Sequence, residues 1–169
     1  VLCQLGRGPE AIGHLEQALR IKPNHVDAQN NLGIALCQQG RLSEGIGHLE
    51  QGLRLKPTDA VMHYNVGTAL WQLGKVAEAI AHYEQALRLK PDYASARTNL
   101  GMALFQLGAK FASSGKWDEA IEQYQREIQM KPDNARAHDR LGVSLVRRRR
   151  VSEAVEHYQK ALELDPRLA

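Results

Sequence analysis

The chain has 169 residues, of which 43% are hydrophobic and 24% charged, and its formal net charge is +3. This composition is typical of a folded domain or a short repeat array, and so small a positive charge does not indicate a nucleic-acid-binding protein. No apolar run approaches the roughly 20 residues of a membrane span, and no signal segment is visible. Because the chain begins at Val1 and not at Met, we expect it to be part of a longer protein.

Proline recurs at a nearly constant interval. Pro23, Pro57 and Pro91 are 34 residues apart, Pro132 follows after 41 residues, and Pro166 follows after 34 again. Each stands after a similar run, such as Ala-Leu-Arg-Leu-Lys, and proline cannot continue a helix. The prolines therefore mark helix ends in a repeat of 34 residues, one copy of which is seven residues longer.

Within residues 60–93, the apolar residues form two stripes at helical spacing. Val66 and Leu70 belong to the first stripe, Gly74 ends it, and the second runs from Val76 to Leu87. Both stripes have a period of about 3.6 residues, so each repeat is predicted to be a hairpin of two helices. The residue after each of four prolines is a good N-cap, and we expect these residues to begin the first helices: Asn24, Thr58, Asp92 and Asp133.

One motif recurs in the first helices and a second in the helices that follow them. An apolar residue followed by glycine occurs at Leu32-Gly33, Val66-Gly67, Leu100-Gly101, Leu107-Gly108 and Leu141-Gly142. Small and aromatic positions of the second helices are Ala11, Ala79, Ala120, Ala154, Tyr83, Tyr124 and Tyr158. A 34-residue helical hairpin with these positions and a closing proline resembles the tetratricopeptide repeat (TPR). The resemblance implies an all-α fold, a right-handed superhelical solenoid of antiparallel helix hairpins.

We expect one TPR array over residues 1–169. Its copies are residues 1–25 (partial), 26–59, 60–93, 94–134 (with seven extra residues) and 135–168. Leu100-Gly101 and Leu107-Gly108 are the same motif seven residues apart, about two helical turns, which returns to nearly the same face. We therefore predict one long helix from Ala94 to Ser113 or Ser114, with Gly115 as its cap, and no loop at residues 109–115.

Repeat 26–59 has three glycines inside its second helix, Gly45, Gly47 and Gly52. Each glycine costs a helix interior about 1 kcal/mol relative to alanine. We therefore predict that this repeat is the least stable.

The sequence contains no phosphate-binding glycine loop, metal-spaced cluster or nucleophile elbow, so we expect no enzyme activity, cofactor or metal site. Cys3 and Cys37 are one repeat apart, too far for a disulfide, and free thiols favour a cytoplasmic location. Four histidines share one place on the second helices and are interpreted as surface residues: His14, His48, His82 and His157.

In the TPR family the first helices line a concave groove, and the resemblance places a row of amides there. Asn31, Asn65 and Asn99 share one groove position, and Gln38 and Gln72 lie two turns further along the same face. Carboxamides both donate and accept hydrogen bonds, so the row can hold a peptide backbone. The row resembles the asparagine ladder of O-linked N-acetylglucosamine transferases. The alternative is a solvated helix face.

Apolar and basic residues complete the expected groove. Trp71 and Phe105 are candidate anchors, with ordinary helix packing as the alternative. Arg136 and Arg140 are expected to attract an acidic group. Asn99, Arg136 and Arg140 also match part of the carboxylate clamp of some TPR proteins. However, Tyr64 and Thr68 stand where that clamp needs Lys and Asn.

Two further features have alternative explanations. Arg147, Arg148, Arg149 and Arg150 form a run that is either a solvated helix end or an anion patch. Glu127 replaces the small residue found at Ala86 and Ala161. A buried charge must pair or reach solvent, so we expect Glu127 to pair with a base or reach solvent, and the helix contact there to be widened.

We predict a protein–protein interaction scaffold that binds an extended peptide or a partner helix in its groove. One alternative is the partner-recruiting TPR region of a larger enzyme, such as a glycosyltransferase. Another is a self-assembly module. Nucleic acid is not an expected partner because the arginine run has no aromatic platform beside it.

Overall fold

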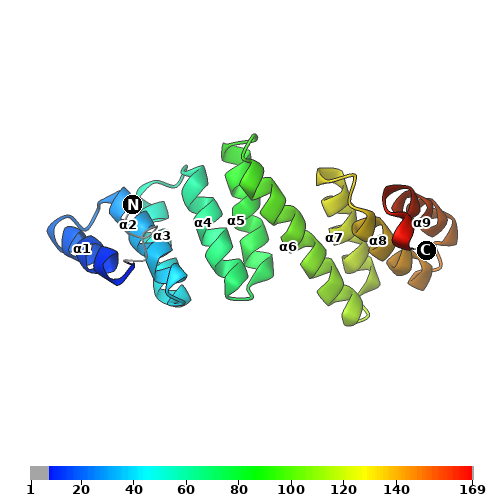
Figure 1. The fold of residues 1–169 in the computed structure, drawn as a ribbon, viewed down its shortest axis with the longest axis horizontal. Coiled ribbons are helices and arrows are strands. Elements are labelled where there is room, and N and C mark those ends of the chain that lie inside the picture. Colours follow the sequence, from blue (N-terminus) through cyan, green and yellow to red (C-terminus); the bar gives the residue numbers. More distant parts are fainter. Residues whose placement is uncertain (1–7, 169) are drawn as a thin grey trace. The chain divides into compact units, whose positions relative to one another are not determined.

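The computed structural model describes residues 8–168. In this range the chain is all-α, as predicted, with nine α-helices and one short 3₁₀ helix and no strand (Figure 1). The α-helices are α1 (Gly8–Ile21), α2 (Val26–Gln38), α3 (Leu42–Leu55), α4 (Ala60–Gln72), α5 (Val76–Leu89), α6 (Ala94–Ser113), α7 (Trp117–Met130), α8 (Ala135–Arg147) and α9 (Val151–Leu164), and the 3₁₀ helix is η2 (Pro166–Leu168). Cys37 is a free thiol, while Cys3 lies outside the described residues.

Tight turns connect the two helices of each hairpin. The turns after α2, α4 and α6 contain Gly40, Gly74 and Gly115, whose φ angles are 78°, 81° and 73°. This left-handed conformation is cheap only for glycine, which explains why the first helices end there. The turn after α8 has Arg149 at this place, with φ 61°.

The N-caps of α2, α4 and α8 lie one residue later than predicted. The cap side chains of α2, α4 and α8 belong to His25, Asp59 and Asn134, which accept hydrogen bonds from backbone N–H groups of the first turn. Asn24, Thr58 and Asp133 are instead inside a turn, because the N–H of each cap residue donates to the carbonyl of Lys22, Lys56 or Lys131. The turn uses the residue after proline, so the helix begins one position later.

The chain forms two compact units, Val1–Ala96 and Arg97–Ala169. In the first unit, Gly67 lies against the ring of Tyr83, and a Cβ atom on Gly67 would be 2.9 Å from that ring. Tyr83 is fully buried there. Since only glycine permits this approach, the apolar-Gly motif of the first helix and the aromatic residue of the second form one contact.

The second unit repeats this contact twice. Gly108 lies against Tyr124 and Gly142 against Tyr158, with distances of 2.8 and 2.7 Å from the added Cβ position to the ring. Around Tyr124, the core contains residues of three helices: Ala120, Ile121, Leu141, Leu145 and Ala154, with Phe105 and Phe111 of α6 packed against them.

Helix α6 is a single helix of 20 residues from Ala94 to Ser113, which confirms the predicted long helix. It begins at the end of the first unit and continues in the second. Its second apolar-Gly motif, Leu107-Gly108, is the one that contacts Tyr124 of α7. At Gly101 an added Cβ would meet only Glu127, at 3.9 Å. The seven extra residues are therefore two helical turns that shift the pairing with α7 along α6.

Candidate functional site

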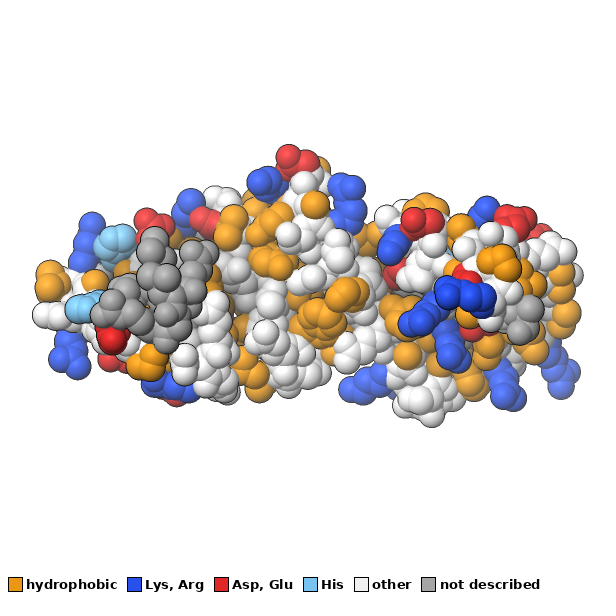
Figure 2. Space-filling model, in the orientation of Figure 1, with side chains coloured by type: hydrophobic (Ala, Val, Ile, Leu, Met, Phe, Trp, Pro, Cys, Tyr) orange, Lys and Arg blue, Asp and Glu red, His pale blue; other side chains and the backbone are white. Residues whose placement is uncertain are grey.

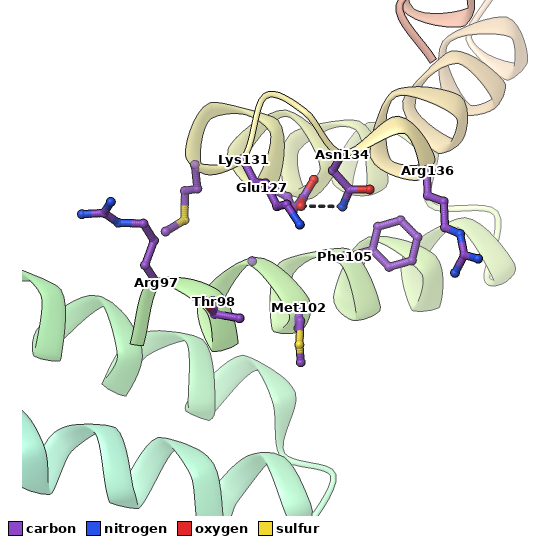
Figure 3. Close-up of a pocket in the computed structure, with 10 residues that line it drawn as sticks. Arg97, Thr98, Met102, Phe105, Glu127, Lys131, Asn134 and Arg136 are labelled. Carbon is purple, nitrogen blue, oxygen red and sulfur yellow. Dashed lines mark hydrogen bonds between the residues drawn. The ribbon is translucent and has the colours of Figure 1, made fainter. Parts of the chain in front are cut away.

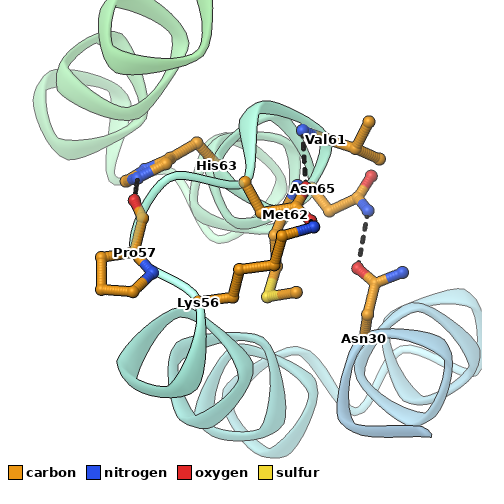
Figure 4. Close-up of polar contacts among 8 residues, drawn as sticks. Asn30, Lys56, Pro57, Val61, Met62, His63 and Asn65 are labelled. Carbon is orange, nitrogen blue, oxygen red and sulfur yellow. Dashed lines mark hydrogen bonds and ion pairs between the residues drawn. The ribbon is translucent and has the colours of Figure 1, made fainter. Parts of the chain in front are cut away.

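An amide pair lies on the first helices of the first unit. Asn65 Nδ2 of α4 donates to Asn30 Oδ1 of α2 at 2.9 Å (Figure 4). The sequence prediction named Asn31, which is exposed, and missed its neighbour Asn30. Adjacent helix residues are about 100° apart, and spacing within one helix does not tell which of two neighbours turns toward the next helix.

The remaining predicted groove residues differ in exposure. Gln38 and Gln72, in the last turns of α2 and α4, are exposed, whereas Trp71 of α4 is half-buried. Asn99, on the part of α6 that belongs to the second unit, is also half-buried.

A pocket in the second unit brings three of the predicted residues together. Phe105 of α6 and Arg136 and Arg140 of α8 line a cavity of about 560 Å³, which we call the groove pocket. Trp117 and Tyr124 of α7 also line it. The rings of Phe105 and Tyr124 are 5.6 Å apart between centroids, so the pocket has an aromatic wall beside two guanidinium groups. Burial raises the pKa of the Tyr124 phenol, and Arg140 opposes that rise.

A second pocket adjoins the first, because Phe105 and Arg136 line both. It has a volume of about 520 Å³, and we call it the Glu127 pocket (Figure 3). Residues of α6, α7, α8 and the turn before α8 line it: Arg97, Thr98, Gly101, Met102, Phe105, Glu127, Met130, Lys131, Asn134 and Arg136.

Glu127 is only 2% exposed. Asn134 Nδ2 donates to its Oε1 at 2.7 Å, and among the described residues Oε2 has no hydrogen-bond partner. Asn134 also caps α8, because its Oδ1 accepts from the N–H of Ala137 at 3.4 Å. The same side-chain amide therefore bonds both the Glu127 carboxyl and the first turn of α8. Burial raises the pKa of the Glu127 carboxyl, while the Asn134 hydrogen bond and Lys131 oppose the rise.

This geometry corrects one expectation about Glu127. Its carboxyl is buried, and among the described residues it is bonded to the amide of Asn134 and forms no ion pair with a base. The widened contact is present, as the pocket between Glu127 and the first half of α6. The sequence signal for this site was the replacement of alanine by glutamate. The partner, a helix cap whose position was predicted one residue too early, was missed.

Three arginines of the run 147–150 contact residues of their own unit. Arg147 lies over the Trp117 ring at 5.6 Å, Arg148 pairs with Asp118 at 2.7 Å, and Arg150 pairs with Glu153 at 2.6 Å. Arg149 is exposed. These contacts favour a helix end that is neutralised by local partners.

Three histidines interpreted as surface residues are half-buried and make contacts. His48, His82 and His157 lie 2.8, 3.1 and 2.9 Å from the side chains of Gln29, His63 and His138. Each partner is 19 residues earlier, on the first helix of the same hairpin. These three are therefore partly exposed residues with a side-chain partner, whereas His14 is exposed. Among the described residues, no cluster of His, Cys, Asp or Glu is suited to a metal ion.

Comparisons with known proteins agree with this architecture. Models described as TPR repeat or tetratricopeptide repeat match residues 1–40 and 67–108, residues 26–56, and residues 111–169. The chain is an array of tetratricopeptide repeats. A search against curated protein sequences gave no match.

Several solved structures resemble this TPR array. A crystal structure of MamA is 28% identical, with a TM-score of 0.67 over 98% of this chain and 93% of that one. The MamA fragment from Desulfovibrio magneticus RS-1 is 24% identical, with a TM-score of 0.64 over 98% and 89%. YrrB, described as a TPR protein with an unusual peptide-binding site, is 23% identical, with a TM-score of 0.68 over 98% and 81%. Within residues 8–168 of this array, the search for a helix long and apolar enough to cross a membrane found none.

Proposed function

We propose that the chain is a protein-interaction scaffold that binds an extended peptide along the first helices of its hairpins. The observation that carries this proposal is the groove pocket, in which Phe105, Arg136 and Arg140 meet in one cavity of about 560 Å³. These residues were selected from the sequence as an apolar anchor and two bases. TPR arrays offer extended surfaces of this kind for partners.

The chemistry of the lining determines the class of peptide. Phe105 and Tyr124 provide an aromatic wall for an apolar side chain, and the guanidinium groups of Arg136 and Arg140 suit a carboxylate. On the face seen in Figure 2, Lys and Arg side chains gather over the C-terminal part of the chain. Residues 97–169 have 13 basic and 10 acidic side chains, a net +3, and therefore hold the whole net charge. The expected ligand is an acidic peptide with an apolar residue beside its carboxylate.

The amide pair supports binding of the peptide backbone in the first unit. Asn30 and Asn65 are joined by only one of the hydrogen bonds that two carboxamides can form. Asn31, Asn65, Gln38, Gln72 and Trp71 are proposed to contact a peptide in the first unit, and Asn99 is proposed as a peptide contact of the second unit. The likeness of this row to the asparagine ladder of O-linked N-acetylglucosamine transferases stays a prediction from the sequence.

Peptide display followed by titration tests the proposal. Peptides selected on the wild-type chain are titrated against the Arg136→Ala/Arg140→Ala double variant and the Asn31→Ala/Asn65→Ala/Asn99→Ala triple variant. We expect both to bind more weakly, the double variant by at least about tenfold, since hydrogen bonds to charged groups contribute about 1.5–3 kcal/mol each. Lys160→Ala is the matched control, because Lys160 is an exposed base of α9 that pairs with Glu163 at 3.0 Å. Equal affinity of wild type and both variants would reject the groove.

The two alternative functions predicted from the sequence require different properties of the protein. A partner-recruiting region of a larger enzyme requires a catalytic domain in the complete protein. A self-assembly module requires concentration-dependent association, which sedimentation velocity of the purified chain measures directly.

A further inference from the structure

The outer face of α9, the last α-helix in Figure 1, carries exposed apolar side chains. Val151, Val155 and Leu162 are spaced four and seven residues apart, so they lie on one face of the helix. Their exposed fractions are 57%, 47% and 40%. Apolar side chains that are exposed together on one face are typical of an interaction surface. We call these three residues the α9 face.

The position of Val155 is covered in the other second helices of the array. Each of α1, α3, α5 and α7 has an isoleucine at this position. These isoleucines are buried, with exposed fractions between 4% and 8%: Ile12, Ile46, Ile80 and Ile121. The exposure of Val155 is therefore a property of α9 and not of the repeat.

The helix that follows explains this difference. In the second unit α8 packs on α7, and Ile121 shares one core with Leu141 and Leu145 of α8. In the first unit α4 packs on α3 in the same way. Helix α9 packs on its own first helix, α8, as α3 packs on α2, but the described residues that follow α9 form only the short η2. The α9 face is therefore the kind of surface on which a first helix packs elsewhere in the array.

The charged side chains beside the α9 face are acidic. Glu156 and Glu163 each follow a residue of the face and are seven residues apart, so both lie along the same flank of the helix. Both are exposed. Glu163 pairs with Lys160 at 3.0 Å, whereas Glu156 has no ion pair among the described residues. Helix α9 contains three glutamates and one lysine, a net charge of −2, within a unit whose net charge is +3. This flank suits a basic partner.

We propose that the α9 face binds a basic amphipathic helix of a partner protein. The apolar residues of that helix pack on the α9 face as α8 packs on α7, and its bases lie beside Glu156 and Glu163. The chain itself contains a helix of this chemistry, because residues 134–148 (α8 with its caps) include four arginines and one aspartate. No residue of α9 lines the groove pocket or the Glu127 pocket, so this surface is separate from the one of the proposed function.

Calorimetric titration with two blocked peptides tests the proposal. One peptide has the sequence of residues 134–148, and its analogue has glutamine in place of all four arginines, which changes the charge but hardly the helix propensity. We expect the arginine peptide to bind the wild-type chain saturably and roughly threefold to tenfold more tightly than the glutamine analogue, as two exposed ion pairs would give. Added salt should reduce this difference. Isolated helices of this length are marginal in water, so circular dichroism should show a gain of helix on binding.

A matched pair of valine substitutions locates the binding surface. Val155→Asn places an amide in the centre of the α9 face and should weaken binding of the arginine peptide by about tenfold, because a covered amide without a partner is unfavourable. Val146→Asn is the control, since Val146 of α8 is 45% exposed and lies outside the α9 face. The double variant Glu156→Lys/Glu163→Lys should weaken binding of the arginine peptide and not that of the glutamine analogue. All four positions are exposed, so the variants should fold, and circular dichroism verifies this.

Three outcomes of the titrations would overturn the proposal. These are no saturable binding of the arginine peptide, equal affinity of the Val155→Asn and Val146→Asn variants, or a glutamine analogue that binds as tightly as the arginine peptide. Sedimentation velocity tests a second copy of the chain as the occupant. Concentration-dependent association that Val155→Asn abolishes would assign the face to self-association and reject the partner helix.

The groove and the α9 face are tested independently of each other. The Arg136→Ala/Arg140→Ala double variant should bind the display-selected peptides more weakly and the arginine peptide as tightly as the wild-type chain. Val155→Asn should have the opposite pattern. If Val155→Asn leaves binding of the arginine peptide unchanged while the arginine double variant loses the display-selected peptides, the groove stands and the α9 face is rejected.

Discussion

Arg149 occupies a backbone conformation that the other repeats reserve for glycine. Its φ of 61° corresponds to the positive φ of Gly40, Gly74 and Gly115. At those three glycines a Cβ would meet no atom within 4 Å, so the turn excludes a side chain only through backbone strain. The backbone strain at Arg149 therefore lowers the stability of the folded chain, and a single substitution can remove that strain.

Arg149→Gly is expected to increase the free energy of unfolding by about 1 kcal/mol, because a left-handed conformation costs roughly 1–2 kcal/mol for a residue with a Cβ and glycine loses some of this gain through its chain entropy. Urea denaturation measures the change. The matched control is Gly74→Arg, which introduces the same strain into the turn after α4 and should destabilise by a similar amount. If the two substitutions shifted stability in the same direction, backbone strain would not be the cause.

In two hairpins, a histidine of the first helix and a histidine of the second are joined by one hydrogen bond between their Nδ1 atoms. His63 Nε2 lies 3.1 Å from the carbonyl of Pro57, which can only accept, so Nε2 carries hydrogen and Nδ1 is the acceptor in the neutral ring. His82 Nδ1, at 3.1 Å, then donates to His63 Nδ1. His138 has the same contacts, with Pro132 at 3.1 Å and His157 at 2.9 Å. A proton added to Nδ1 of His63 or His138 would place two N–H groups against each other.

This geometry predicts a loss of stability in mild acid. Burial, and then the charge of His63 or His138, lowers the pKa of His82 and His157 below the ordinary value of 6.5. Below that value the unfolded chain binds more protons than the folded chain, so stability is complete above about pH 6.5 and is lost as pH falls through the lowered pKa values. The melting temperature should therefore decrease between about pH 7.5 and about pH 5.5.

The chain itself provides the control for this effect. At the place of His63 and His138, the hairpin α2–α3 has Gln29, whose Oε1 lies 2.8 Å from His48 Nδ1 and tolerates a protonated ring. The double variant His63→Gln/His138→Gln converts both pairs to this form, and its melting temperature should depend less on pH. An unchanged pH dependence would show that other groups cause the acid sensitivity.

At the scale of elements, α6 contains two apolar-Gly motifs that perform different tasks. Gly108 permits the Tyr124 ring to approach, as Gly67 does for Tyr83. Gly101 faces Glu127 and its pocket. The two glycines are equivalent in sequence, but only one is required by close packing.

Alanine at the two positions should have opposite effects on stability. Gly101→Ala is expected to stabilise by about 0.5–1 kcal/mol through helix propensity, since its nearest neighbour is 3.9 Å away. Gly108→Ala places a methyl group 2.8 Å from the Tyr124 ring and should destabilise by about 1–3 kcal/mol. Thermal or urea unfolding compares the two. The reverse order would mean that α7 pairs with the first motif in solution.

The sequence predicted the elements better than the contacts between them. Repeated spacing is sufficient to place α6 from Ala94 to Ser113, because two copies of one motif seven residues apart fit only a continuous helix. The Asn30–Asn65 contact depends on which of two adjacent side chains turns toward the next helix, and spacing within a helix does not contain that information. The Glu127–Asn134 contact depends on a cap whose position was predicted one residue too early.

At the scale of the whole molecule, the stability of a repeat array is distributed along the chain, since each repeat contacts only its neighbours. Helices α3 and α5 belong to one unit and have 14 residues each. The three glycines of α3 correspond to alanines in α5: Gly45 to Ala79, Gly47 to Ala81 and Gly52 to Ala86. Gly45 is required by packing against backbone, whereas Gly52 lies against the flexible side chain of Met62. A Cβ on Gly45 would be 2.6 Å from the Gly33 carbonyl oxygen, and one on Gly52 would be 2.6 Å from the Met62 sulfur.

Packing does not require glycine at position 47, because a Cβ on Gly47 would meet nothing within 4 Å. We therefore expect amide hydrogen exchange to be faster in α3 than in α5, by an amount that reflects up to about 1 kcal/mol for each glycine. Gly47→Ala should slow exchange across α3 by about fivefold, which corresponds to about 1 kcal/mol. Gly45→Ala is the contrasting variant and should accelerate exchange, because the helix contact with Gly33 must open. Slower exchange in α3 than in α5 of the wild-type chain would contradict the expectation that residues 26–59 form the least stable repeat, and would mean that the close approach at Gly33 and Gly45 outweighs the entropy of the glycines.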